Sequence, residues 1–219
     1  MIIVLDGPAG SGKSSTAKAI ADKLHLQYLD SGALYRAITY QYIKAGESSS
    51  LFDNLDKMNL TFNYDAGSFR VFIDDEDCTA AIRSKQVSGS VSKVAANPLV
   101  RRYVNRLMKN YASSFASIAD GRDLGSAVFP DAAVKFYLQA SAEVRAERRT
   151  SEMHQMGQEV SYDEVLHNIM ERDRIDSSRE HDPLRKAEDA IVVQTDQMTF
   201  EEQVALCIQH ILSKTSHTT

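Results

Sequence analysis

Eight residues near the start of the chain combine glycines, a lysine and a serine at a spacing that suits phosphate binding. The run is Gly7-Pro8-Ala9-Gly10-Ser11-Gly12-Lys13-Ser14, which matches G-x-x-x-x-G-K-[ST]. Glycines let backbone N–H groups turn inward around phosphate oxygens. The lysine reaches the β- and γ-phosphates, and the serine hydroxyl ligates Mg²⁺. The run therefore predicts a P-loop that holds a nucleoside triphosphate, although it does not specify the reaction.

Arginines form a second group with chemical potential. Arg36 and Arg122 follow predicted strands, as Lys13 does. Ligands of open α/β sheets lie beyond the carboxyl ends of the strands, so we expect these three cations to converge. Phosphoryl transfer between two polyanions needs such charge around the reacting groups.

A further arginine cluster has two readings that the sequence leaves open. Arg145, Arg148 and Arg149 are spaced i, i+3 and i+4, which places them on one helix face. They either reach the phosphates or pair with nearby glutamates. Those glutamates are Glu143, Glu147 and Glu152.

The elements around the P-loop predict a parallel α/β sheet. Residues 2–5 form an apolar run typical of a buried strand, and the apolar spacing at residues 17–24 predicts an amphipathic helix. A second short strand at 26–29 completes a right-handed βαβ unit. Three further apolar runs fit the same sheet, at 117–119, 134–138 and 191–193.

Two other segments have recognisable local patterns. Residues 60–64 and 69–73 alternate in polarity around a Gly-containing turn, which predicts an antiparallel β insertion over about 59–80. Thr199 and Glu202 form a capping box that opens the last helix. We expect that helix to bury the apolar residues Val204, Ile208, Ile211 and Leu212.

Composition excludes several classes. The chain has 219 residues, 43% of them hydrophobic, and a net charge of −5, which suits one globular domain and argues against general nucleic-acid binding. No apolar run reaches membrane-spanning length, and residues 1–5 lack the features of a signal peptide, so we expect a cytoplasmic protein. Two cysteines without metal-ligand spacing predict ordinary thiols.

Five segments in order resemble the bacterial cytidylate kinases, which are P-loop nucleoside monophosphate kinases. They are Gly7–Ser15, Leu29–Arg36 (L-D-S-G-A-L-Y-R), Ala119–Gly125 (A-D-G-R-D-L-G), Phe129–Ala132 and Glu171–Asp173. The second and third are far more specific than the P-loop. The resemblance covers the chain to about residue 213.

The resemblance implies an enzyme that uses ATP and Mg²⁺ to convert CMP and dCMP into CDP and dCDP in pyrimidine nucleotide metabolism. Gly7 to Ser15 would bind ATP, with Ser14 on the metal, and Lys13, Arg122 and Arg149 would be catalytic. The residues implied to bind CMP are Ser31, Arg36, Ser92, Arg101, Arg122, Asp123, Arg172, Asp176 and Arg179. It also implies a monomer that binds neither nucleic acid nor membrane.

The implied fold is one P-loop kinase domain. Its five-stranded parallel sheet has helices on both faces, with the core at 1–30, 115–145 and 180–219. A monophosphate-binding region at about 31–114 contains the β insertion. A helical lid covers about 146–175, where Met156 replaces a common basic residue and leaves one phosphate contact in doubt.

Base chemistry agrees with cytosine as the ligand. The N4 amino group of cytosine donates to a carboxylate such as Asp123, whereas the O4 of uracil would be repelled. Asp120 either orients metal-bound water or caps the Gly121 turn, and Asp30 is similar. Two alternatives stay open: a P-loop kinase of a nucleoside or small acid, and a nucleotide-dependent switch without kinase turnover.

Overall fold

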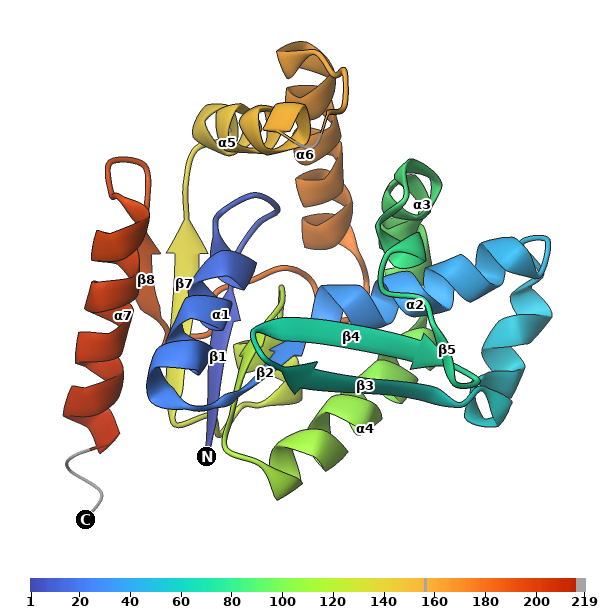
Figure 1. The fold of residues 1–219 in the computed structure, drawn as a ribbon, viewed down its shortest axis with the longest axis horizontal. Coiled ribbons are helices and arrows are strands. Elements are labelled where there is room, and N and C mark those ends of the chain that lie inside the picture. Colours follow the sequence, from blue (N-terminus) through green and yellow to red (C-terminus); the bar gives the residue numbers. More distant parts are fainter. Residues whose placement is uncertain (156, 216–219) are drawn as a thin grey trace.

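A five-stranded parallel sheet forms the centre of the computed structural model, which describes residues 1–155 and 157–215. The strand order is β2-β6-β1-β7-β8, and every neighbouring pair is parallel (Figure 1). The strands are β1 (Ile2–Asp6), β2 (Gln27–Asp30), β6 (Ser117–Asp120), β7 (Val134–Gln139) and β8 (Ile191–Gln194). The predicted sheet is therefore confirmed.

The central strands are short apolar runs because both faces of the sheet are covered. Ile3, Val4 and Leu5 of β1 are fully buried, and all four residues of β6 are buried. A parallel sheet covered on both faces favours continuous apolar strands over alternating ones. The charged exceptions in β1 and β6 are Asp6 and Asp120, each the last residue of its strand, where the sheet meets the P-loop.

The covering helices follow from the crossover rule. The connection from β1 to β2 runs through α1 (Lys13–Leu24), and the return to β6 includes α2 (Ser31–Lys44) and α4 (Pro98–Ser114). These connections cross the sheet in opposite directions, so right-handed crossovers place α1 and α4 on opposite faces. The last helix, α7 (Phe200–Thr215), packs against α1.

The last helix confirms one prediction and corrects another. Its capping box is present: the Thr199 N–H donates to Glu202 Oε2 at 2.8 Å, and the Glu202 N–H donates to Thr199 Oγ1 at 3.2 Å. Val204 and Ile211 are buried and Ile208 is half-buried, but Leu212 is 51% exposed, so its predicted burial is wrong. At 3.6 residues per turn Leu212 lies about 80° from Val204, at the edge of the apolar stripe.

The predicted β insertion is a separate three-stranded antiparallel sheet. It consists of β3 (Leu60–Asp65), β4 (Ser68–Ile73) and the short β5 (Glu76–Asp77). A 3₁₀ helix, η1 (Ser49–Lys57), precedes it. Tyr64 and Phe69 of this sheet pack edge-on against the Tyr28 ring of β2. The insertion is therefore fixed to the core through an aromatic contact at the edge strand.

The remaining elements surround the carboxyl ends of the central strands. The segment after the insertion contains η2 (Ala81–Arg83) and α3 (Lys85–Ala95), and β6 is followed by one π-helical turn, η3 (Leu124–Val128). The helices α5 (Ala142–Gln155) and α6 (Tyr162–Ser178) lie above the sheet at the top of Figure 1. They contain most of the residues, about 146–175, that were predicted to form a lid. Met156 lies outside the described residues.

A small apolar cluster holds α5 and α6 together. Ala146 of α5 packs with Val165 and Ile169 of α6, apart from the main core. None of the helices in the described part of the chain is long and apolar enough to span a membrane.

Candidate active site

The P-loop connects β1 to α1 and makes a close backbone contact with the sheet. Gly7 has φ 148°, and a Cβ atom at this position would lie 2.1 Å from the backbone oxygen of Leu138 in β7. No side chain fits at that distance, so the first motif position requires glycine. Gly10 and Gly12 also have positive φ values, 76° and 86°, which turn the loop around a central space.

Lys13, at the start of α1, points back over this loop. Its Nζ donates to the Pro8 carbonyl at 2.7 Å and contacts Ser11 Oγ at 3.4 Å. Burial lowers the pKa of Lys13 well below its usual value, and the positive charge of Arg122 adds to this effect. One carbonyl and one hydroxyl do not balance the charge of a buried ammonium, so this position suits an anionic ligand.

Ser14 and Asp120 form the oxygen-rich part of the site. Ser14 Oγ donates to Asp120 Oδ2 at 2.7 Å, and the Tyr28 hydroxyl donates to the other carboxylate oxygen at 2.6 Å. Burial raises the pKa of Asp120, and the charge of Asp30 contributes. Both Asp120 carboxylate oxygens accept from side-chain hydroxyls, those of Ser14 and Tyr28, whereas the alternatives of orienting metal-bound water and capping the Gly121 turn stay predictions.

This pair fits the magnesium ion that a P-loop nucleotide brings. Hydroxyl and carboxylate groups are hard oxygen donors, which Mg²⁺ prefers, and the ion keeps several waters that a nearby carboxylate can orient. Asp30 has a different task. It caps α2 through the Ala33 N–H at 2.8 Å and forms an ion pair with Arg83 at 3.3 Å.

Arg36, Arg122, Arg149 and Arg172 lie close to one another, and two of them, Arg122 and Arg172, act together with burial to lower the pKa of Lys13. Burial and the charges of Arg122 and Arg36 lower the pKa of Arg172 to about 10, and Arg149 contributes to the same effect. Burial likewise lowers the pKa of Arg36, although Asp30 opposes it. Like charges therefore lie close together in a largely desolvated place, an arrangement that a bound anion stabilises.

Two of these guanidinium groups have an unused donor. Arg36 Nε and Arg172 Nε are buried and have no hydrogen-bond partner among the described residues. Leaving a buried charged donor unsatisfied costs more than the about 1–3 kcal/mol of a neutral group. Arg122 differs, because its Nε contacts Asp176 Oδ2 at 3.1 Å. The two free donors mark a place for an anion with several acceptor oxygens, which a phosphate supplies.

Asp123, one residue after Arg122, lies between two buried arginines. Arg101 of α4 contacts one carboxylate oxygen, and Arg179 donates to the other at 2.8 Å. Burial raises the pKa of Asp123, whereas the two arginines oppose the shift. A carboxylate has about four acceptor positions, so it can take one more donor from a ligand.

The ion pairs continue on both sides of Asp123. Arg101 Nε contacts Asp182 at 2.9 Å, and Arg179 lies 3.8 Å from Asp176, which in turn pairs with Arg122. One chain of alternating charges thus joins the surroundings of Asp123 to the arginine cluster. The family resemblance implied that Asp123, Asp176 and the three arginines form one ligand site, and the fold brings them together.

Two other predicted ligand residues lie in the same region. Ser92 is a buried residue of α3, a helix that contacts α2, α4 and α6, the helices that carry Arg36, Arg101 and Arg172. Ser31 begins α2, and its hydroxyl donates to the Asp120 carbonyl at 2.7 Å, so it also fixes α2 to β6. Sequence reasoning missed Tyr35, whose ring lies 5.7 Å from the Arg101 guanidinium carbon. It also missed Asp182, because only the tertiary fold places that residue beside Arg101.

The arginines of α5 do not act as one group. Arg145 is buried and pairs with Asp173 of α6 at 2.7 Å, whereas Arg148 donates to the Thr195 hydroxyl at 3.1 Å. Arg149 pairs with Glu152 at 2.6 Å on a partly exposed surface. The pairing of Arg149 with Glu152 confirms the glutamate reading for one arginine, whereas contact of this cluster with the phosphates stays a prediction.

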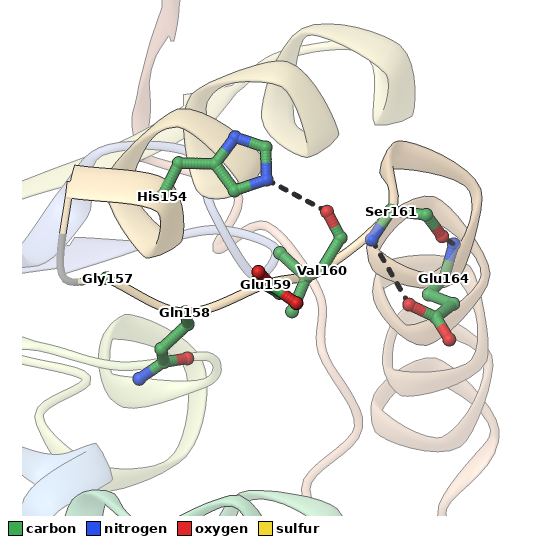
Figure 2. A pocket seen from close by; sticks show the side chains of 7 residues that line it. All are labelled: His154, Gly157, Gln158, Glu159, Val160, Ser161 and Glu164. Carbon is green, nitrogen blue, oxygen red and sulfur yellow. Dashed lines mark hydrogen bonds between the residues drawn. The ribbon is translucent and has the colours of Figure 1, made fainter.

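A hollow lies at the turn between α5 and α6, and none of the residues of the arginine cluster is among those that line it. Figure 2 shows its lining, in which the His154 ring nitrogen contacts the Val160 carbonyl at 2.9 Å. Ser161 and Glu164 form the capping box that starts α6, visible on the right of Figure 2. These contacts shape the turn between α5 and α6.

Comparisons with known proteins agree with this arrangement. The family model for cytidylate kinase matches residues 3–213. A cytidylate kinase of Carboxydothermus hydrogenoformans is 43% identical over 217 residues, covering 96% of this chain and 97% of that protein. A cytidylate kinase of Fusobacterium nucleatum is 40% identical, covering 93% and 94%.

A solved structure extends the likeness to the fold. An uncharacterised protein from Eubacterium ventriosum superimposes with a TM-score of 0.55 at 13% identity, covering 97% of this chain and 98% of that one. Because the match to the family model and the identity to its members extend over almost the entire sequence, this chain belongs to the cytidylate kinase family.

Proposed function

We propose that the protein transfers the γ-phosphoryl group of ATP to CMP and dCMP, producing ADP with CDP or dCDP. The observation that carries this proposal is the arginine cluster beside Lys13, with its two unused buried donors on Arg36 and Arg172. A P-loop by itself accounts for only one nucleotide-binding site. A second, cationic site next to it fits an acceptor that already carries a phosphate.

The reaction needs no general base. An oxygen of the acceptor phosphate is already anionic, so it forms a bond to the γ-phosphorus while the bond to the oxygen bridging the β and γ groups breaks. Arg36, Arg122 and Arg172 hold the acceptor phosphate in line. Lys13 offsets charge on the transferring group, and Arg149 at the lid approaches from the other side.

The loop from Gly7 to Ser15 binds the donor phosphates through backbone N–H groups and the start of α1. When bound, Mg²⁺ neutralises charge on the β- and γ-phosphates. We assign Ser14 as its protein ligand and Asp120 as the group that orients its waters. Closure of α5 and α6 excludes water, which would otherwise accept the phosphoryl group.

Base selection depends on Asp123. Its carboxylate accepts from the cytosine N4 amino group, and the donors Arg101 and Ser92 serve the cytosine acceptors. Arg172, Asp176 and Arg179 contact the sugar and its surroundings. We further infer a cytoplasmic monomer that consists of one kinase domain, with the monophosphate-binding region at about 31–114 and the lid at about 146–175.

The test is ADP release from ATP and Mg²⁺ with CMP, dCMP, UMP, AMP, GMP and cytidine as acceptors. Turnover mainly on CMP and dCMP is the expected result. Turnover mainly on UMP or AMP would refute the role of Asp123 while keeping the phosphate site. Turnover on none of the six would refute the proposed activity.

A further inference from the structure

Two adjacent residues of α6 face different parts of the active site. Arg172 lies in the arginine cluster, where Arg122 and Arg36 lower its pKa together with burial. Asp173 contacts the P-loop, because its carboxylate accepts from the Ala9 N–H at 3.4 Å. One rigid helix therefore touches the acceptor site and the donor loop through neighbouring side chains.

The P-loop contact is reinforced by Arg145 of α5. Arg145 Nη1 pairs with Asp173 Oδ2 at 2.7 Å and donates to the Ala9 carbonyl at 2.9 Å. The ion pair thus holds both backbone polar groups of Ala9. Hydrogen bonds in which one partner is charged are stronger than neutral hydrogen bonds, so the two contacts fix the orientation of the Ala9 peptide.

Arg145 itself has little freedom to move. It is buried, and its Nε donates to the Ala140 carbonyl at 3.0 Å, directly after β7. A Cβ atom on Gly10 would lie 3.2 Å from Arg145 Cβ, so the tip of the P-loop packs against α5. Through Arg145, the start of α5 is therefore attached both to the end of β7 and to the P-loop.

We propose that the Arg145–Asp173 pair is a positioning pair that couples the donor and acceptor sites, so that either nucleotide strengthens binding of the other. Phosphates that bind in the P-loop fix the orientation of the Ala9 peptide. Because the Arg145–Asp173 pair binds this peptide, it then also fixes the position of α6. Arg172 lies on α6 and is therefore held in position for the acceptor. This inference rests on the proposed function, because it requires two nucleotide sites.

Calorimetry measures the coupling directly. The dissociation constant of CMP is determined with and without a saturating non-hydrolysable ATP analogue and Mg²⁺. We expect the analogue to tighten CMP binding by about fivefold or more in the unaltered protein, the lower end of typical coupling. In Asp173→Asn this factor falls to about one, while CMP binding without the analogue changes by less than about threefold.

Three variants separate coupling from general damage. Glu171→Gln is the matched control, because Glu171 lies on the same helix and pairs with exposed Arg174 at 2.7 Å; it keeps the full factor. Asp173→Glu retains the charge and restores part of the factor. Arg145→Lys retains a positive charge but loses the planar guanidinium, whose Nη1 contacts both Asp173 and the Ala9 carbonyl while Nε binds the Ala140 carbonyl. It should therefore lower the coupling factor, and it replaces Asp173→Asn as the test if that variant does not fold.

The outcomes distinguish the two claims. Coupling that is absent in the unaltered protein, or unchanged in both Asp173→Asn and Arg145→Lys, overturns the inference while CMP binding still supports the proposed function. Binding of the ATP analogue without any binding of CMP would refute the proposed function itself. Equal loss of coupling in Glu171→Gln overturns the specific role of the pair.

Discussion

Replacing Asp123 by asparagine tests base reading with almost no change in shape. The carboxylate is buried between Arg101 and Arg179, and both arginines are buried as well. Removing one partner of a buried ion pair costs about 3–5 kcal/mol. Each arginine keeps another carboxylate here, Asp182 or Asp176, so we expect the lower value, about 3 kcal/mol of unfolding free energy.

The same change alters which base the site accepts. The amide side chain introduced by Asp123→Asn presents a donor where the carboxylate presents only acceptors. The contact to cytosine N4 therefore weakens, and a contact to the uracil O4 becomes possible. A hydrogen bond to a charged group contributes about 1.5–3 kcal/mol. The ratio of kcat/KM for CMP over UMP should therefore fall by about 10- to 100-fold.

Urea unfolding and steady-state kinetics on both acceptors measure the two effects separately. Asp182→Asn is the control: Asp182 also pairs with Arg101, but its side chain is 37% exposed, and its φ of 47° is one that asparagine adopts readily. We expect this control to lose stability and keep the CMP/UMP ratio. An unchanged ratio in Asp123→Asn, together with the expected loss of stability, would refute the role in base reading.

Three further changes follow from the geometry around the P-loop. Asp6 accepts two backbone N–H groups of η3, at 2.9 and 2.7 Å, and burial raises its pKa from 3.8 to about 7. The fold thus favours its protonated form, so its contribution to stability is present at low pH and is lost as pH rises from about 4 to about 7. The stability deficit of Asp6→Asn should therefore shrink by about 2 kcal/mol between pH of about 5.5 and about 8.5; a constant deficit in urea unfolding at the two pH values would contradict this. Gly7→Ala forces a Cβ onto the Leu138 carbonyl and should cost about 2–4 kcal/mol in thermal unfolding, whereas an unchanged melting temperature would show that the loop can shift freely. Tyr28→Phe removes one donor from buried Asp120, so it should lower stability by about 1–3 kcal/mol and weaken binding of the Mg²⁺ complex of ATP more than of metal-free ATP; equal weakening of both in calorimetry would exclude a role toward the metal.

Local sequence patterns were sufficient to predict much of the fold and part of the candidate site. The P-loop, the hairpin and the capping box of α7 depend on residues close together in the chain, so spacing alone predicts them. Lys13, Arg36 and Arg122 follow strands, and the rule that ligands lie beyond strand ends predicted that these three cations converge, as they do in the fold.

The long-range ion pairs could not be predicted from spacing. Asp182 meets Arg101 from 81 positions away, and Arg145 reaches Ala9 from 136 positions away. Helical spacing indicated only that Arg145 and Arg149 share a face, and it carries no information about which neighbouring element supplies each partner. The family resemblance grouped the ligand residues, but it did not indicate that their charges form one continuous chain.

The central claim is that the arginine cluster holds the phosphate of the acceptor. Calorimetric titration of the protein with CMP and with cytidine tests it most directly, because the two ligands differ only in that phosphate. At least two charge-assisted contacts, from Arg36 and Arg172, should make CMP bind about 100-fold or more tightly than cytidine. Equal affinity for CMP and cytidine would contradict the account.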